Sequence, residues 1–172
     1  MSFLPLNSPS ILKAIMTTQP TPLPVSLFDI IAWVETKNNP HAMRFEPTVY
    51  TGFASKRLSA AWARIRSVHN CSEGTADMIY STSFGAVQVM GFNLYSGSYG
   101  GDIVSFCGDT IAQATVFEEF VSNNGILCTP DTLAAQPAVR SSFARKYNGD
   151  QTGAYAAQIV YALQHFGFEV TP

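Results

Sequence analysis

Glu35 is the carboxylate whose position in the sequence best suits acid–base chemistry. It lies near the end of LFDIIAWVETKNNP, residues 27–40, where apolar residues recur at helical spacing after the capping pair Ser26 and Asp29. This pattern predicts a helix that places Glu35 at the edge of its buried face. Partial burial and the negative end of the helix dipole both raise the pKa of a carboxyl group. Such a group can act as a general acid near neutral pH, although a surface glutamate that ends a core helix shows the same pattern.

Two later stretches carry polar side chains that could support an acid at this position. Ser83, Gly85 and Gln88 belong to the stretch SFGAVQVM, and Tyr147 and Asn148 lie at the predicted end of a helix. Each stretch alone is a weak signal, because Gln88 could be a solvated helix residue and Tyr147 could simply pack against the core. Their value depends on whether they occur together in a known order.

Taken together, the three stretches resemble the signature of the soluble lytic transglycosylases. Residues 35–42, ETKNNPHA, are similar to the E-S-x-x-N-P-x-A motif of that family, with Thr36 in place of serine. Residues 83–90 are similar to its S-x-G-x-x-Q-[IV]-M segment, and residues 147–149 to its Y-N-x-G segment. The order, the spacing and the predicted helical context all agree.

A closer resemblance is to phage-encoded muramidases. Residues 44–50, RFEPTVY, are similar to the R-F-E-P segment that follows the glutamate motif in those proteins. Residues 81–93, STSFGAVQVMGFN, match a second segment except at Phe84, where tryptophan is usual. The resemblance covers roughly residues 27–165. It identifies the chain as similar to the lysozyme-like peptidoglycan glycosidases.

This resemblance implies cleavage of the β-1,4 bond between N-acetylmuramic acid and N-acetylglucosamine in peptidoglycan glycan strands. It implies that Ser83 and Gln88 form hydrogen bonds around the acid or the sugar. Gly85 is expected to let the glycan approach the backbone without a Cβ in the way. Tyr147 is expected to donate its hydroxyl to the catalytic carboxylate, and Asn148 to shape the same wall.

By the same resemblance Glu35 is the catalytic acid, and Glu46 is the candidate for a second catalytic carboxylate, eleven positions later (46 − 35 = 11). Lytic transglycosylases work with one glutamate, whereas hydrolysing muramidases usually add a second carboxylate. Glu46 suits the second scheme, but it could equally pair with Arg44 or a helix end as a structural residue. Asp77 and Asp102 are weaker candidates.

The fold is predicted to be mainly α, with a lysozyme-like domain of the goose-type or lytic transglycosylase kind at residues 26–172. Residues 1–25 are predicted to be an extension, with a short helix at 10–16 and a proline-rich linker at 18–25. Seven to nine short helices are expected, with at most a small β-hairpin near 46–56. The helices are predicted within 27–40 and at 56–68, 72–80, 83–93, 102–107, 109–124, 131–135, 137–146 and 151–166.

Composition argues against several other functions. A net charge of -2 does not suit nucleic-acid binding, which needs a basic face. No apolar run is long enough to span a bilayer, so we expect no stable membrane insertion. The N-terminus lacks the basic region of a signal peptide. We therefore expect a phage particle or another export route to carry the protein to the periplasm or cell wall. In a phage particle, tail or virion proteins would be its partners. The scattered histidines and cysteines predict no metal site and no cofactor.

Two alternative functions remain open. Cys71 just precedes a predicted helix, whose dipole would lower the pKa of its thiol, and His165 lies downstream. This pair makes a cysteine peptidase of the cell wall one alternative. The other is a non-catalytic wall-binding or virion structural module on the same fold. The retention of Glu35 argues against it, because such a module has no need of the acid.

Overall fold

The computed structural model describes residues 24–172, so the helix predicted at 10–16 and most of the linker predicted at 18–25 lie outside the described residues. Eleven helices and three short strands occur in this described part. In chain order they are α2 (Leu27–Thr36), β1 (Met43–Phe45), α3 (Pro47–Tyr50), α4 (Phe53–Lys56), α5 (Ala60–His69), α6 (Glu73–Tyr80), β2 (Thr82–Phe84), β3 (Val89–Met90), α7 (Gly91–Ser96), α8 (Ile103–Gly108), α9 (Thr110–Asn123), α10 (Pro130–Ala135), α11 (Pro137–Asn148) and α12 (Ala154–His165).

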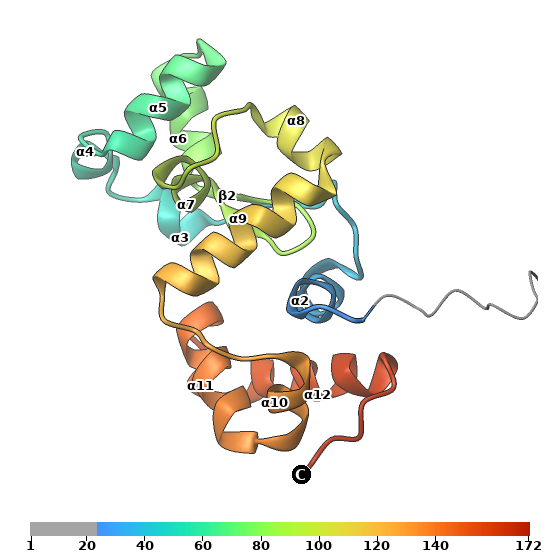
Figure 1. Ribbon diagram of the computed structural model, residues 1–172. Helices are drawn as coiled ribbons and strands as arrows, with labels where there is room; N and C mark the ends of the chain where they lie inside the picture. The colour runs from blue at the N-terminus through green and yellow to red at the C-terminus, as the bar shows by residue number, and fades with distance from the viewer. Residues whose placement is uncertain (1–23) are drawn as a thin grey trace, which may run out of the picture.

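The helices form two groups, with α2 between them (Figure 1). Helices α3 to α8 lie around the small sheet, and α10 to α12 form the second group. Helix α9 runs from the first group toward the second, and α2 packs against both α9 and α12. No helix in the described part of the chain is long and apolar enough to cross a bilayer.

Two single-turn helices, α3 and α4, account for the excess over the predicted number of helices. They occupy most of the stretch 46–56, so the hairpin predicted there is wrong. Proline at the first position of α3 fixes a backbone angle that suits a helix and removes a donor that a strand pair would need. The single turns are too short to show a helical period in the sequence.

Helix α2 has the boundaries that its capping residues predict. Ser26 accepts a hydrogen bond from the backbone of Asp29, whose carboxylate accepts one from the Ser26 amide at 2.8 Å. The helix ends where Lys37 takes the left-handed conformation, with φ 57°. The partly buried Trp33 stacks on His165 of α12, with ring centroids 4.8 Å apart. The capping box and this contact fix the helix that carries Glu35.

The sheet is antiparallel, in the order β1-β2-β3, and pairs Arg44 with Ser83. The helical turn predicted at 83–93 is therefore wrong, because β2 and β3 form a hairpin there and α7 begins only at its end. Gly85 and Gln88 both have positive φ, 80° and 53°, which reverses the chain between the strands. A glycine adopts this conformation readily, but a glutamine does so rarely, so the sequence gives little sign of the turn.

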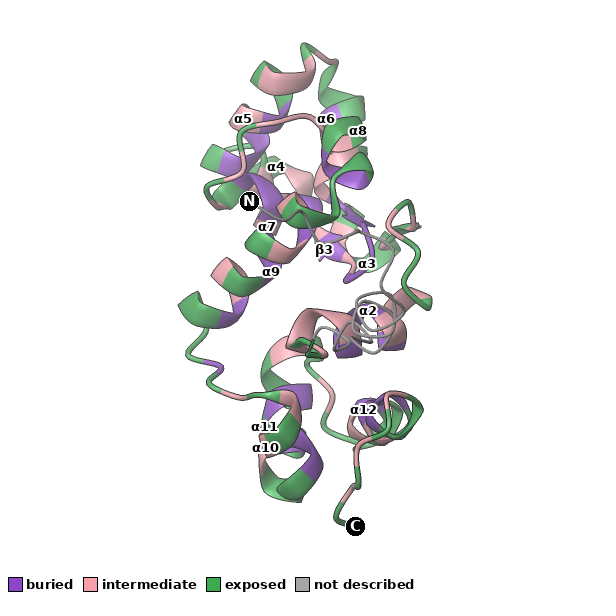
Figure 2. Ribbon diagram, turned by 45° about the vertical axis from the view of Figure 1, so that its right-hand side comes forward, coloured by how far each residue is buried: buried purple, intermediate pink, exposed green. Residues whose placement is uncertain are grey.

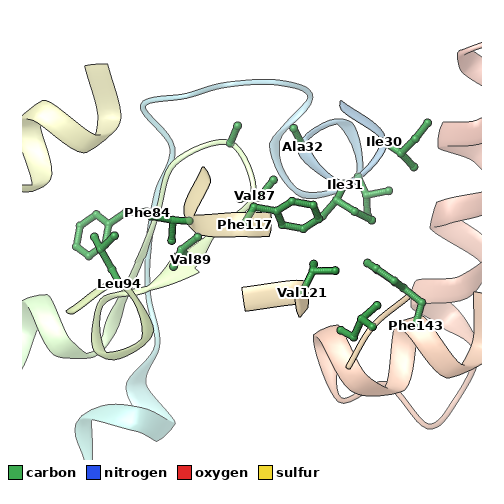
Figure 3. Close-up of a cluster of buried hydrophobic side chains, with 14 of the residues drawn as sticks. Ile30, Ile31, Ala32, Phe84, Val87, Val89, Leu94, Phe117, Val121 and Phe143 are labelled. Atoms are coloured by element: carbon green, nitrogen blue, oxygen red, sulfur yellow. The ribbon is translucent and has the colours of Figure 1, made fainter. Parts of the chain in front are cut away.

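One core joins α2, the hairpin and the two groups of helices. Figure 2 shows buried residues along one side of α9 and α11 and exposed residues along the other. Figure 3 shows side chains from these elements that belong to one cluster of buried apolar residues. The labelled residues are Ile30, Ile31 and Ala32 of α2, Phe84, Val87 and Val89 of the hairpin, Leu94 of α7, Phe117 and Val121 of α9, and Phe143 of α11.

Candidate active site

A pocket opens beside the last turn of α2, between the hairpin, α9 and α11. It contains four of the seven predicted site residues, Glu35, Gln88, Tyr147 and Asn148, together with Arg44, Val89, Met90, Asn93, Phe117 and Phe120. Three predicted residues do not line it, namely Ser83, Gly85 and Glu46. The sequence-based prediction omitted Arg44 and Asn93. The pocket therefore offers one carboxyl group, one guanidinium and several amides beside apolar walls.

Glu35 is half-buried and has a hydrogen-bond partner that the sequence did not reveal. The hydroxyl of Tyr155, in the first turn of α12, donates to Glu35 Oε1 at 2.6 Å. Burial raises the pKa of Glu35 above its ordinary value, as predicted. The Tyr155 hydrogen bond and the charge of Arg44 act in the opposite direction, and the charge of Glu46 adds to the rise. Burial has the largest effect, so the acid holds its proton to higher pH than an exposed glutamate would.

The expected contact between Tyr147 and Glu35 is wrong in its details. The hydroxyl of Tyr147 donates to the Val87 carbonyl at 2.7 Å, and Tyr155 makes the bond to the carboxylate instead. The ring of Tyr147 stacks on Phe143 with centroids 5.3 Å apart. Tyr147 thus ties α11 to the hairpin turn and forms a wall of the pocket. Tyr155 was missed because an aromatic residue on the apolar face of a helix is indistinguishable from core in a sequence.

Glu46 forms the pair with Arg44 that the sequence offered as one alternative. Its Oε1 accepts a hydrogen bond from Arg44 Nε at 2.6 Å, which makes an ion pair at the end of β1. Glu46 stays outside the pocket lining, yet it lies close enough to Glu35 for its charge to raise the pKa of that acid.

Ser83 and Gln88 form a hydrogen-bonded unit in which Gln88 lines the pocket and Ser83 does not. The buried hydroxyl of Ser83 lies 2.9 Å from Gln88 Oε1 and 3.2 Å from the Arg44 carbonyl, both of which are acceptors. Gln88 Nε2 donates to the carbonyls of Gly85, at 3.0 Å, and Ala42, at 3.3 Å. These bonds hold the Gln88 amide in place and join the hairpin turn to the start of β1.

Gly85 does not face the pocket, so its expected role in admitting the glycan is wrong. A Cβ at this position would lie 2.7 Å from Oε1 of the buried Gln113. Gln113 uses that oxygen to accept the Ala86 amide hydrogen, also at 2.7 Å. Its Nε2 donates to the carbonyls of Pro40, at 3.1 Å, and Phe106, at 3.0 Å. One side chain of α9 thus joins the hairpin turn, the loop after α2 and the end of α8.

Replacing Gly85 with alanine should lower the free energy of unfolding by about 2–4 kcal/mol, because the new Cβ combines a left-handed backbone with a clash against Gln113. Gly149→Ala is the matched control, since Gly149 has a φ of 77° but open space where a Cβ would lie. Its expected loss is about 1 kcal/mol, from the backbone alone. Urea unfolding of both variants measures the difference. Equal losses would contradict the clash with Gln113.

Thr36 connects the helix of the acid to the hairpin. Its hydroxyl donates to the Ala86 carbonyl at 2.8 Å and accepts the Asn39 amide hydrogen at 3.0 Å. The Asn39 side chain in turn accepts from the His41 amide at 3.0 Å. These contacts give the stretch after Glu35 a physical role, because they fix where α2 ends relative to the opposite wall of the pocket.

The weaker carboxylate candidates are structural. Asp77 is buried and accepts from Trp62 Nε1 at 2.8 Å, and its bond with Arg57 lowers the pKa of its carboxyl group. Asp102 caps α8 by accepting from the Ser105 amide at 2.8 Å. Neither residue lines the pocket.

The cysteine–histidine pair considered from the sequence does not assemble. Cys71 lies between α5 and α6, whereas His165 lies at the end of α12, in the other group of helices (Figure 1). The three cysteines are free thiols, and burial raises the pKa of Cys128 to about 11. Within residues 24–172, no three histidine, cysteine or acidic side chains gather in a way that could hold a metal ion.

Most of this chain is similar in sequence to known cell-wall enzymes. The model of the N-acetylmuramidase family matches residues 29–166, a range that includes every residue of the pocket. The endolysin of Enterobacteria phage PRD1 is 40% identical over 150 residues, which cover 83% of this chain and 97% of that protein. No solved structure matches the chain significantly.

Proposed function

This chain belongs to the N-acetylmuramidase family, and on that basis we propose that Glu35 is the general acid with which it cleaves peptidoglycan. The fold is the lysozyme-like fold expected from the sequence, mainly helical with a small antiparallel sheet, and the protein is a phage-type peptidoglycan glycosidase. The observation that carries the proposal is the half-buried Glu35 carboxyl, whose pKa is raised at the wall of the pocket.

The proposed reaction breaks the β-1,4 bond between N-acetylmuramic acid and N-acetylglucosamine. Tyr155 donates to Oε1 of Glu35, so the acid proton resides on Oε2, from which it passes to the leaving glycosidic oxygen. Among the described residues that line the pocket, Glu35 is the only acid, because Glu46 pairs with Arg44 outside it. This arrangement supports a scheme in which Glu35 first gives its proton and then, as a carboxylate, accepts one from the attacking hydroxyl.

The other walls of the pocket suit an N-acetylated sugar. Gln88, Asn93 and Asn148 offer amide groups that can bind hydroxyl and acetamido groups. Phe117 and Phe120 offer apolar surface for the faces of the sugar rings. We propose Gln88, Tyr147 and Asn148 as contacts of the glycan, and we assign Ser83 and Gly85 to the support of the hairpin.

Tyr155→Phe should lower kcat about tenfold, because the hydroxyl stabilises the carboxylate that forms as Glu35 loses its proton. Removing this donor also disfavours the charged form, so the pKa of Glu35 rises further. Because the enzyme needs Glu35 protonated, activity then persists to higher pH. The alkaline limb of the pH–rate profile should therefore move upward while the maximum falls.

Tyr161→Phe is the control for this change, since Tyr161 lies on the same helix and is 67% exposed. It should leave both the rate and the pH profile as they are. A Tyr155→Phe protein with a lower rate but an unchanged alkaline limb would assign Tyr155 to packing alone.

The test of the proposed function is mass spectrometry of muropeptides released from purified peptidoglycan. Fragments cut between the two sugars support the assignment, and the new muramyl end identifies the attacking group. A reducing end identifies water, and a 1,6-anhydro end identifies the C6 hydroxyl of the sugar itself. Released peptides with intact glycan would contradict glycosidic cleavage, and binding without release would support the non-catalytic alternative.

We also propose where the enzyme acts. Its substrate supports action in the periplasm or cell wall, reached with a phage particle or by another export route. Virion or tail proteins would be its partners in the first case. Every residue that lines the pocket lies within 26–172, which supports assigning the catalytic domain to that range. Detection of the protein in purified particles would support delivery with the virion, and its presence only in infected-cell extracts would contradict it.

A further inference from the structure

Arg44 brings a positive charge into the pocket that contains Glu35. Its side chain lines the pocket with Glu35, and its positive charge opposes the rise in the pKa of that acid. The Arg44 side chain is 57% exposed, and its Nε is bound by Glu46. Within the described part of the chain, its two terminal nitrogens have no hydrogen-bond or ion-pair partner. The guanidinium of Arg44 is thus bound at Nε, while its terminal nitrogens are free to bind a ligand.

The backbone around this guanidinium is fixed on both sides. Arg44 lies opposite Ser83 in the sheet, and its carbonyl accepts the Ser83 hydroxyl at 3.2 Å. The Glu46 amide donates to the Ser81 carbonyl at 2.8 Å, so the partner carboxylate is also anchored. Glu46 is only 25% exposed, which shields the ion pair more than one on an open surface. These contacts therefore restrict where the terminal nitrogens of Arg44 can lie.

We propose that Arg44 binds a carboxylate of the peptide stem carried by the muramyl sugar, and thereby makes the enzyme prefer peptide-bearing glycan. The planar guanidinium presents parallel N–H groups that match a carboxylate, while Glu46 occupies Nε. The sugars of the backbone carry hydroxyl and acetamido groups, whereas the stem peptide carries free carboxylates. The proposal rests on the proposed function, because it requires the glycan to lie in the pocket with Glu35.

Binding at Arg44 would also raise the pKa of Glu35. A carboxylate on the guanidinium neutralises the charge that lowers the pKa of Glu35, so the acid keeps its proton more firmly in the complex. The other groups that act on the pKa of Glu35 are Tyr155 and Glu46, and they remain in place. The protein and the bound substrate would thus together set the pKa of Glu35.

The experiment compares cleavage of native peptidoglycan with that of peptidoglycan whose carboxylates have been converted to amides with a carbodiimide and ammonia. For the wild type we expect kcat/KM to be roughly tenfold higher on the native material, and this ratio should shrink as salt is added. For Arg44→Gln we expect a ratio near one. Arg145→Gln, at an exposed arginine of α11 away from the pocket lining, is the control and should keep the wild-type ratio.

Equal wild-type rates on both substrates, or an Arg44→Gln protein that keeps the preference, would overturn the proposal. The lactyl carboxyl of the muramyl sugar forms the amide bond to the stem, so it is a free carboxylate only where the stem is missing. On such sugars it is the other possible source of the charge. Amidase-treated strands, which have lost the stem but carry that carboxylate, should be cleaved as slowly as the amidated material. If the wild type cleaved the amidase-treated strands as fast as native peptidoglycan, Arg44 would bind the lactyl carboxylate, and the proposal that it binds the stem would be refuted. Because the ratio is measured in active proteins, it can fail while Glu35 keeps its assigned role.

Discussion

Glu35→Gln should lower the rate of muropeptide release by about 10²- to 10⁴-fold, the usual contribution of a general acid. Glutamine keeps the size of the side chain and an oxygen that can accept from Tyr155, but it has no proton to give to the leaving group. The variant should still bind purified peptidoglycan, since the walls of the pocket are unchanged. Clearance at the wild-type rate would remove Glu35 from the mechanism.

The same variant should be more stable than the wild type at neutral pH. Burial raises the pKa of Glu35 in the folded state, so the folded protein binds the proton more tightly than the unfolded chain. Stability is therefore lost as the pH rises from the ordinary glutamate value of 4.5 through the raised folded value. Glutamine avoids this loss. Melting temperatures should show an advantage for the variant at pH 7 that disappears below pH 4.5, where Glu35 is protonated in both states.

Gln113→Met should lower the free energy of unfolding by at least about 3 kcal/mol, the largest effect on stability that we expect outside the apolar core. Methionine fills a similar volume, so the change removes the hydrogen bonds rather than opening a cavity. It leaves the Ala86 amide and the carbonyls of Pro40 and Phe106 without their buried partner. The hairpin turn should then shift relative to α2, and the rate of cleavage should fall as well.

Gln158→Met is the control, because Gln158 lies on the exposed side of α12. It should change the free energy of unfolding by less than about 0.5 kcal/mol. Chemical unfolding of the two variants gives the comparison. A Gln113→Met protein as stable as the control would mean that water or a backbone shift readily replaces these hydrogen bonds.

The parts of the fold that depend on local signals could be predicted from the sequence. Ser26 and Asp29 define the start of α2, Asp102 caps α8, and Pro137 opens α11 as its N1 position predicts. The same is true of Glu35, since its place on α2 follows from the helical period. Capping and periodicity act within a few residues, and they remain readable whatever the rest of the chain does.

The remaining parts of the site depend on contacts between distant residues. Tyr155 and Glu35 are 120 positions apart, and no local pattern connects them. The hairpin was missed because Gln88, an ordinary helix former, takes a left-handed conformation and donates to the distant Ala42 carbonyl. The roles expected for Gly85 and Tyr147 failed for the same reason. Gly85 faces Gln113 of α9 rather than the glycan, and Tyr147 donates to the Val87 carbonyl rather than to Glu35.

The turn of the β2–β3 hairpin restricts how the protein can be lengthened. Ala86 and Val87, in the middle of the turn, are 3% and 1% exposed, whereas hairpin turns are ordinarily the places where a chain accepts inserted residues. An added loop or affinity tag at this turn would have to displace the core itself. The segment between α9 and α10, where Leu127 is 92% exposed, is a far better junction for a fused wall-targeting peptide.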